Sequence, residues 1–250
     1  MNASARENKW PWGEGYQRRF QTEEQAEEII GLLSLENARG LVDIGCGNGR
    51  FAIEVARRFP ACLIWAFDPL ESAVAECKEA GAGLLQKNLR VDIADAERIP
   101  LPDGRVDRAL MRNVLHHVPD PAGAIAEIGR LLKPGGLVLL EGPGNHGDAP
   151  LGELMSDFHF IWDDSRKRRY HQPETVIGWF ADAGIDAKLA GSWPYTHKLG
   201  AEAARLITEC GAEKELGLEM KEDGSGTVRL TIFRIIGGKR EAFGVDKGAG

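Results

Sequence analysis

The residues best placed to do chemistry form a glycine-rich turn, Gly45-Cys46-Gly47-Asn48-Gly49, which follows a short apolar segment. Glycine lets the backbone turn sharply and lets a ligand approach the main chain. Asp43 lies within the apolar segment before the turn, and Asp68 ends the next apolar segment. A carboxylate such as Asp68 can accept hydrogen bonds from both hydroxyls of a ribose, so the pattern predicts a site for a nucleotide-like cofactor.

The spacing of the glycines separates two kinds of cofactor. A dinucleotide-binding turn reads G-x-G-x-x-G and holds a pyrophosphate at a helix N-terminus. Here the third glycine comes one residue earlier, in the order G-x-G-x-G, and an acid lies inside the preceding strand at Asp43. A ribose-binding acid at Asp68 suits either cofactor, but the shorter spacing argues against NAD.

The elements around the turn follow from hydrophobic periodicity. Thr22 and Gln25 form a capping box that begins a helix, and Asp120-Pro121 is a favourable helix start. Strands are predicted at 41–44, 63–67, 89–93, 106–111 and 137–140, and helices at 23–35, 50–59, 70–80 and 121–132. Strands and helices that alternate in this way predict an α/β fold with a mostly parallel sheet covered on both faces.

The periodicity weakens after Glu141, and residues 142–172 show no clean period. Further elements are predicted as a helix at 174–183, a strand near 185–191, a helical stretch near 199–215 and a β-prone run at 227–236. We expect one domain over 21–236, preceded by the segment 1–20 and followed by a mobile tail, 237–250, with little apolar content.

Composition and charge limit the class of partner. The net charge is −7 and the isoelectric point is about 5.5, whereas a nucleic-acid-binding protein normally presents a basic face. The one basic run, Arg166–Arg169, is predicted to be a solvated turn, with contact to an anionic substrate as the alternative. Nucleic acid is therefore disfavoured as a partner, and a small molecule is the expected substrate.

The four cysteines include no C-x-x-C pair, so neither a zinc site nor a disulfide framework is predicted. The first residues lack an apolar signal region, and no later apolar run is long enough to span a membrane. We expect a soluble, cytoplasmic protein without a bound metal. The sequence carries no signal of its oligomeric state.

Four motifs in order resemble those of the class I S-adenosylmethionine-dependent methyltransferases, most closely the small-molecule group that includes the ubiquinone and menaquinone methyltransferases. The resemblance covers about residues 40–141. Besides the glycine turn, the motifs are Asp95-Ala96-Glu97-Arg98-Ile99-Pro100-Leu101-Pro102-Asp103, Arg112-Asn113-Val114-Leu115-His116-His117-Val118 and Leu131-Leu132-Lys133-Pro134-Gly135-Gly136. The resemblance implies a Rossmann-like, doubly wound sheet of seven strands with an antiparallel last strand. It also implies S-adenosylmethionine as cofactor and S-adenosylhomocysteine as product.

The resemblance implies a role for each cofactor residue. Asp68 would hold the ribose hydroxyls, Asp95 would accept a hydrogen bond from the adenine amino group, and the Ala96 amide would donate to a ring nitrogen. Asn113 would face the methionyl end and the substrate. Asp43 would either orient the turn or bind the methionyl ammonium through water. The methionine and ribose parts would lie along the three glycines, Gly45, Gly47 and Gly49.

The substrate side is predicted from two inserts, near 142–172 and 193–226, and from residues 1–20, a candidate lid that can alternatively pack on the first helix. Candidate substrate contacts are Trp10, Trp12, Tyr16, His146, Trp162 and Tyr170. Methyl transfer needs a base only when the acceptor carries a proton that must leave. His159, and after it His171, are the candidate bases, whereas His116 and His117 are expected to pack beside the cofactor.

Three other functions share this pattern. A methyltransferase acting on tRNA or protein is one alternative, although the segment after the fourth strand lacks the Asn/Asp-Pro-Pro-aromatic signature that grips a base amino group. An NAD-dependent oxidoreductase is a second, and a non-catalytic relative of the fold is a third. The glycine spacing, Asp95 and the Pro-Gly-Gly motif argue against the oxidoreductase. The three glycines kept together with Asp68 and Asp95 argue against the non-catalytic relative.

Overall fold

The computed structural model describes residues 22–85, 87–144, 171–199, 201–209 and 218–241. The first described helix is α2 (Glu23–Leu32), and its capping box is confirmed. The Thr22 hydroxyl accepts from the Gln25 amide at 3.2 Å, and the Thr22 amide donates to the Gln25 side chain at 3.2 Å. The helix ends before the predicted residue 35, because Ser34 takes a left-handed backbone conformation and a short 3₁₀ turn, Leu35–Asn37, follows.

The predicted alternation of strand and helix is confirmed through the first half of the chain. The elements are β1 (Gly40–Ile44), α3 (Arg50–Arg58), β2 (Leu63–Asp68), α4 (Glu71–Ala80), β3 (Leu89–Ile93), β4 (Val106–Arg112), the 3₁₀ turn Leu115–His117 and α5 (Pro121–Leu131). Asp120 caps α5, since its side chain accepts from the Gly123 amide at 3.0 Å. Proline follows at the first helical position, where its missing N–H costs nothing.

The second half of the chain differs from its predicted bounds. It consists of β5 (Leu132–Gly144), α7 (Pro173–Asp182), β6 (Ile185–Leu199), α8 (Ala201–Glu209), β7 (Glu219–Met220) and β8 (Gly226–Lys239). The Pro-Gly-Gly segment, which separates the predicted helix from the predicted strand, lies within β5, at a shift in its register with β4. Strand β8 continues to Lys239, three residues beyond the predicted end of the strand at 236, because it pairs there with β6.

The sheet confirms the predicted class. Its order is β3-β2-β1-β4-β5-β8-β6, with β7 paired to β8. The pairs among β1 to β5 are parallel, and β8 is antiparallel to both β5 and β6. The order reverses beside β1, between β2 and β4, which is the point where open α/β sheets bind ligands beyond the carboxyl ends of their strands.

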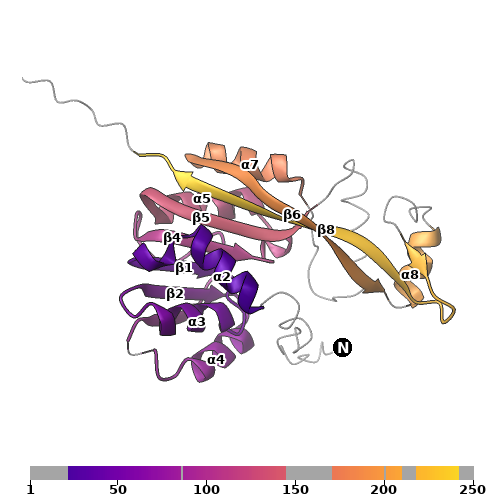
Figure 1. Cartoon of the computed structure of the whole chain (residues 1–250), viewed down its shortest axis with the longest axis horizontal. Coiled ribbons are helices and arrows are strands. Elements are labelled where there is room, and N and C mark those ends of the chain that lie inside the picture. Colours follow the sequence, from indigo (N-terminus) through magenta and orange to yellow (C-terminus); the bar gives the residue numbers. More distant parts are fainter. Residues whose placement is uncertain (1–21, 86, 145–170, 200, 210–217, 242–250) are drawn as a thin grey trace, which may run out of the picture.

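Helices cover both faces of the sheet (Figure 1). One core joins α2, α3 and α4 to the sheet through residues such as Ile29, Val55 and Cys77. The other joins α5 and α7 to the opposite face through residues such as Ile125 and Phe180. No helix among the described residues is long and apolar enough to cross a membrane.

Strands β6 and β8 continue as a two-stranded ribbon beyond the other strands, with α8 near the far end (Figure 1). Strand β5 pairs with β8 only as far as Thr231, opposite Gly144. Strand β6 pairs with β8 five residues further, to Gly226 opposite Leu199. Strand β6 is therefore longer than the strand that the apolar pattern predicted at 185–191.

Candidate functional site

The glycine turn is hydrogen-bonded to the end of β2. The amides of Gly45 and Cys46 both donate to the Phe67 carbonyl, at 2.7 and 2.9 Å. Gly45 has φ +72° and Gly49 has φ +77°, a region that side chains rarely adopt. A Cβ at Gly45 would lie 2.1 Å from the Val114 side chain. Only glycine therefore fits both the backbone and the space of this turn.

Asp68 fastens the turn to the start of α4. One carboxylate oxygen accepts from the Gly47 amide at 2.9 Å, and the other accepts from the Leu70 amide at 2.9 Å. The residue is only 4% exposed. Sequence reasoning assigned Asp68 to a ribose and missed its structural role, because a backbone donor leaves no sequence signal.

Asp43 lies beneath the turn with 4% of its surface exposed. Burial raises the pKa of its carboxyl, the guanidinium of Arg112 lowers it and the nearby charge of Asp68 raises it, and together these effects bring the pKa to about 7. The folded protein therefore favours the neutral carboxyl more than water does. A cationic group that bound here would favour the ionised form.

Cys46, inside the turn, is buried beside Cys77 of α4. A hydrogen bond between the two thiols and burial raise the pKa of Cys46 well above its ordinary value. Because the thiolate is the reactive form, this disfavours Cys46 as a nucleophile.

The segment that carries Asp95 and Ala96 lies next to the end of β2. The Ala94 amide donates to the Asp68 carbonyl at 3.3 Å, and the Arg98 amide closes a turn on the Asp95 carbonyl at 3.1 Å. Ala96 is 8% exposed, whereas the Asp95 side chain is on the surface. The segment with the two predicted adenine contacts therefore lies next to Asp68, the predicted ribose contact.

Asn113 follows β4 with φ +55°, one of two non-glycine residues in the described ranges with a left-handed backbone. Asparagine tolerates this conformation better than most residues. Its amide donates to the Glu141 carbonyl at 2.7 Å. The structure thus brings the glycine turn, Asp68, Asp95 and Asn113 to one edge of the sheet, at the carboxyl ends of β1 to β4.

A row of buried charges crosses the sheet beside this edge, and sequence reasoning did not find it. Arg112, Glu141 and Arg234 are directly opposite one another on β4, β5 and β8. Glu141 pairs with Arg112 at 3.1 Å and with Arg234 at 2.6 Å, and its side chain is 1% exposed. Glu28 of α2 pairs with Arg234 at 2.5 Å, and the Trp193 ring stacks on that guanidinium.

The residues of this row are far apart in the sequence, and no predicted strand or helix depends on any of them. The signal is an acid and two arginines at positions that the sheet buries. It can be recognised only once the strand register is known.

Most predicted substrate residues lie outside the described residues: Trp10, Trp12, Tyr16, His146, His159, Trp162 and Tyr170. His171 is described, and its ring meets Trp179 of α7 edge-on at 4.9 Å. Its carbonyl lies near Gly144, at the end of β5. His116 is buried, and its ring is 4.0 Å from that of His117. The roles of these residues stay predictions.

Residues 42–140 match the family model described as a methyltransferase domain. Trans-aconitate 2-methyltransferase from Acidovorax sp. is 30% identical over 148 residues, which are 58% of this chain and 55% of that protein. The chain spans about half the length, or less, of the curated relatives that it matches.

Two solved structures share the fold. The YcgJ protein from Bacillus subtilis superposes with a TM-score of 0.77 at 20% identity, over 88% of this chain and 100% of that one. Geranyl diphosphate methyltransferase, solved in complex with S-adenosylmethionine, gives a TM-score of 0.61 at 18% identity, over 92% of each chain.

Proposed function

We propose that this chain, whose residues 42–140 match a methyltransferase domain, is a class I S-adenosylmethionine-dependent methyltransferase that transfers the methyl group of S-adenosylmethionine to a small-molecule acceptor. The observation that carries the proposal is the convergence of the glycine turn, Asp68 and the Asp95 segment at one sheet edge. The closer resemblance to the quinone methyltransferases and a cytoplasmic location remain predictions.

The described residues fit an adenosyl cofactor. A Cβ at Gly45 or Gly49 would collide with the side chain of Val114 or of Cys77, so the turn keeps this shape only with glycine at both positions. The two acids that follow β2 and β3, Asp68 and Asp95, are acceptors suited to ribose hydroxyls and to an exocyclic amino group. In the proposed site Asp68 binds the ribose, Asp95 and Ala96 bind the adenine, and Asn113 meets the methionyl end.

When bound, S-adenosylmethionine supplies a methyl group already activated by its sulfonium. In the proposed reaction, an acceptor lone pair forms a bond to the methyl carbon as the sulfur–carbon bond breaks and its electron pair returns to sulfur. The protein's part is to align donor and acceptor and to exclude water. Asp43, buried beneath the turn, fixes the methionyl end when ionised. His159 or His171 takes a proton where the acceptor carries one.

A small acceptor is supported by the net charge of −7, which disfavours a polyanionic partner. It is also supported by the relative described as trans-aconitate 2-methyltransferase, which matches over 58% of this chain. Transfer of labelled methyl to RNA or protein in a cell extract would favour the macromolecular alternative instead.

Thermal unfolding with S-adenosylmethionine, S-adenosylhomocysteine and NAD tests the cofactor. A ligand at about 100 times its Kd adds about 2.7 kcal/mol to the free energy of unfolding. We expect both sulfur ligands to raise Tm and NAD to leave it unchanged. Asp95→Ala should reduce the shift without lowering Tm in the absence of ligand, since that side chain is exposed. A shift with NAD alone would replace the proposal with an oxidoreductase.

A further inference from the structure

The segment between β3 and β4 is held partly by its own backbone and partly by side chains of α5. It carries Asp95 and Ala96, and it buries Ile99, which is 2% exposed. A buried backbone group needs a hydrogen-bond partner. Two backbone bonds close turns within the segment, from the Arg98 amide to the Asp95 carbonyl and from the Leu101 amide to the Ile99 carbonyl. The Ile99 amide and the Leu101 carbonyl have their partners on two side chains of α5.

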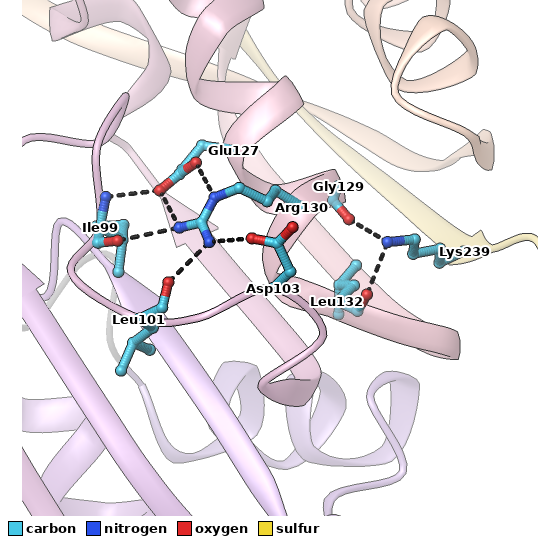
Figure 2. Close-up of polar contacts among 8 residues, drawn as sticks. All are labelled: Ile99, Leu101, Asp103, Glu127, Gly129, Arg130, Leu132 and Lys239. Carbon is cyan, nitrogen blue, oxygen red and sulfur yellow. Dashed lines mark hydrogen bonds and ion pairs between the residues drawn. The ribbon is translucent and has the colours of Figure 1, made fainter.

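Glu127 and Arg130 supply those partners (Figure 2). Glu127 accepts from the Ile99 amide at 2.7 Å. Arg130 donates to the Ile99 carbonyl at 3.1 Å and to the Leu101 carbonyl at 2.7 Å. It also pairs with Asp103 at 2.7 Å. One guanidinium therefore holds three points of the segment at once.

The two α5 side chains also hold each other. Glu127 accepts from the Nε and Nη2 of Arg130, each at 2.7 Å. The Glu127 side chain is 9% exposed. Hydrogen bonds to Glu127 and Asp103 raise the pKa of Arg130, so the guanidinium stays charged. A planar guanidinium that donates in several fixed directions restricts position more than an ammonium does.

Both ends of the Asp95 turn are therefore fixed. On one side, the Ala94 amide bonds to the carbonyl of Asp68. On the other side, Ile99 is held by Glu127 and Arg130, and the bond from the Arg98 amide to the Asp95 carbonyl closes the turn between them. A displacement of Ile99 is transmitted to Asp95 because only one closed turn separates them.

We propose that Glu127 and Arg130 are positioning residues for adenine recognition: by holding the segment at Ile99 and Leu101, they place Asp95 and the Ala96 amide against the purine edge. The inference rests on the proposed function, since it needs an adenosyl ligand at this site. It assigns the selectivity for adenine to two side chains of α5 that would not contact the ligand themselves, because the segment with Asp95 and Ala96 would lie between.

The test compares two ligands that differ only at the purine edge, S-adenosylhomocysteine and its deaminated analogue S-inosylhomocysteine. The analogue has a carbonyl in place of the amino group and a protonated ring nitrogen, so it loses both the bond to Asp95 and the bond from Ala96. At about tenfold for each lost hydrogen bond, the wild-type protein should prefer the adenosyl ligand about 100-fold.

Arg130→Lys keeps the charge and loses the fixed directions of the guanidinium, and Glu127→Gln loses one acceptor. We expect both variants to bind the adenosyl ligand more weakly and to prefer it only about tenfold or less. Titration calorimetry of the full chain measures both dissociation constants. Loss of stability alone would weaken the binding of both ligands together and would leave their ratio unchanged.

Lys239→Ala is the matched control. Lys239 donates to the carbonyls of Gly129 and Leu132 at the C-terminal end of α5, and it does not contact the segment (Figure 2). This variant should lower Tm and keep the wild-type ratio. The inference is overturned if Arg130→Lys and Glu127→Gln keep that ratio, or if Lys239→Ala loses it equally. A wild-type protein that binds neither ligand would instead overturn the proposed cofactor.

Discussion

At the scale of single residues, the protein buries charge where its proposed ligand would sit. Asp43, Arg112, Glu141 and Arg234 alternate in sign across β1, β4, β5 and β8, and each is largely withdrawn from water. Such charges are tolerated only when each has partners, because burial without them costs several kcal/mol. The row can therefore be tested one residue at a time.

Glu141→Gln should cost about 3–5 kcal/mol of the free energy of unfolding, because it leaves two buried guanidiniums without their shared counter-charge. Urea unfolding measures the change. The control is Asp186→Asn, which removes the exposed pair with Arg240 and should cost about 1 kcal/mol or less. Equal losses in the two variants would mean that the buried carboxylate does not balance the row.

Asp43 gives a pH dependence with a definite sign. Its pKa rises from 3.8 to about 7 on folding, so the folded protein retains a proton that the unfolded chain has lost. The resulting stabilisation is fully present below about pH 4 and disappears as the pH rises through 7. Asp43→Asn removes this dependence, so its stability relative to the wild type should increase between pH 5 and pH 8.

Unfolding in urea at the two pH values checks this expectation. Glu76→Gln, which alters an exposed acid on α4, is the control and should show no such change. If Asp43→Asn and the wild type change in parallel with pH, then Asp43 is already ionised throughout that range.

At the scale of elements, most of the first half of the chain could be predicted because its signals are local. The glycine turn, the capping box at Thr22 and the proline start of α5 each occupy a few consecutive residues. The end of α2 was misplaced because Ser34, not a glycine, takes the left-handed conformation. The contacts of Asp68 and Arg130 could not be predicted, since they join residues that only the fold brings together.

The glycine turn gives a prediction at this scale. Gly49→Ala should destabilise the protein by more than about 2 kcal/mol, because it needs φ +77° and its Cβ would lie 2.0 Å from the Cys77 sulfur. Adding Cys77→Ala should recover part of the loss by removing the collision. Thermal and urea unfolding of the single and double variants measure both effects.

Gly178→Ala is the comparison for this pair. Gly178 lies inside α7, and no atom outside its own helix lies within 4 Å of the position that an alanine Cβ would take. Alanine there should therefore stabilise the protein by about 0.4–1 kcal/mol. If Gly49→Ala were equally harmless, the turn would have to be able to adopt another conformation.

At the scale of the whole molecule, the ribbon of β6 and β8 is separable from the sheet that carries the proposed cofactor site. Among the described residues between Thr196 and Arg229, β6 and β7 pair only with β8, beyond its last β5 partner, Thr231. The sequence predicted a substrate-side insert near 193–226, and that assignment remains a prediction.

Replacing residues 196–229 with an Asn-Gly turn would close the hairpin at the pair of Tyr195 with Leu230. We expect the shortened protein to fold and to bind S-adenosylhomocysteine with near wild-type affinity, while methylation of its acceptor falls. Calorimetry and a labelled-methyl assay separate the two outcomes. Loss of cofactor binding would show that the ribbon supports the sheet edge after all.

The position of β8 has a consequence for synthesis on the ribosome. This strand is the last in the described chain, yet it lies between β5 and β6, and β6 has no other partner in the described sheet. Until β8 emerges, the hydrogen-bonding edge of β5 is open and β6 is unpaired, and open edges of this kind promote aggregation. A product that ended before Gly226 would thus lack β8 and keep the β5 edge open, and chaperones and proteases would have to remove it.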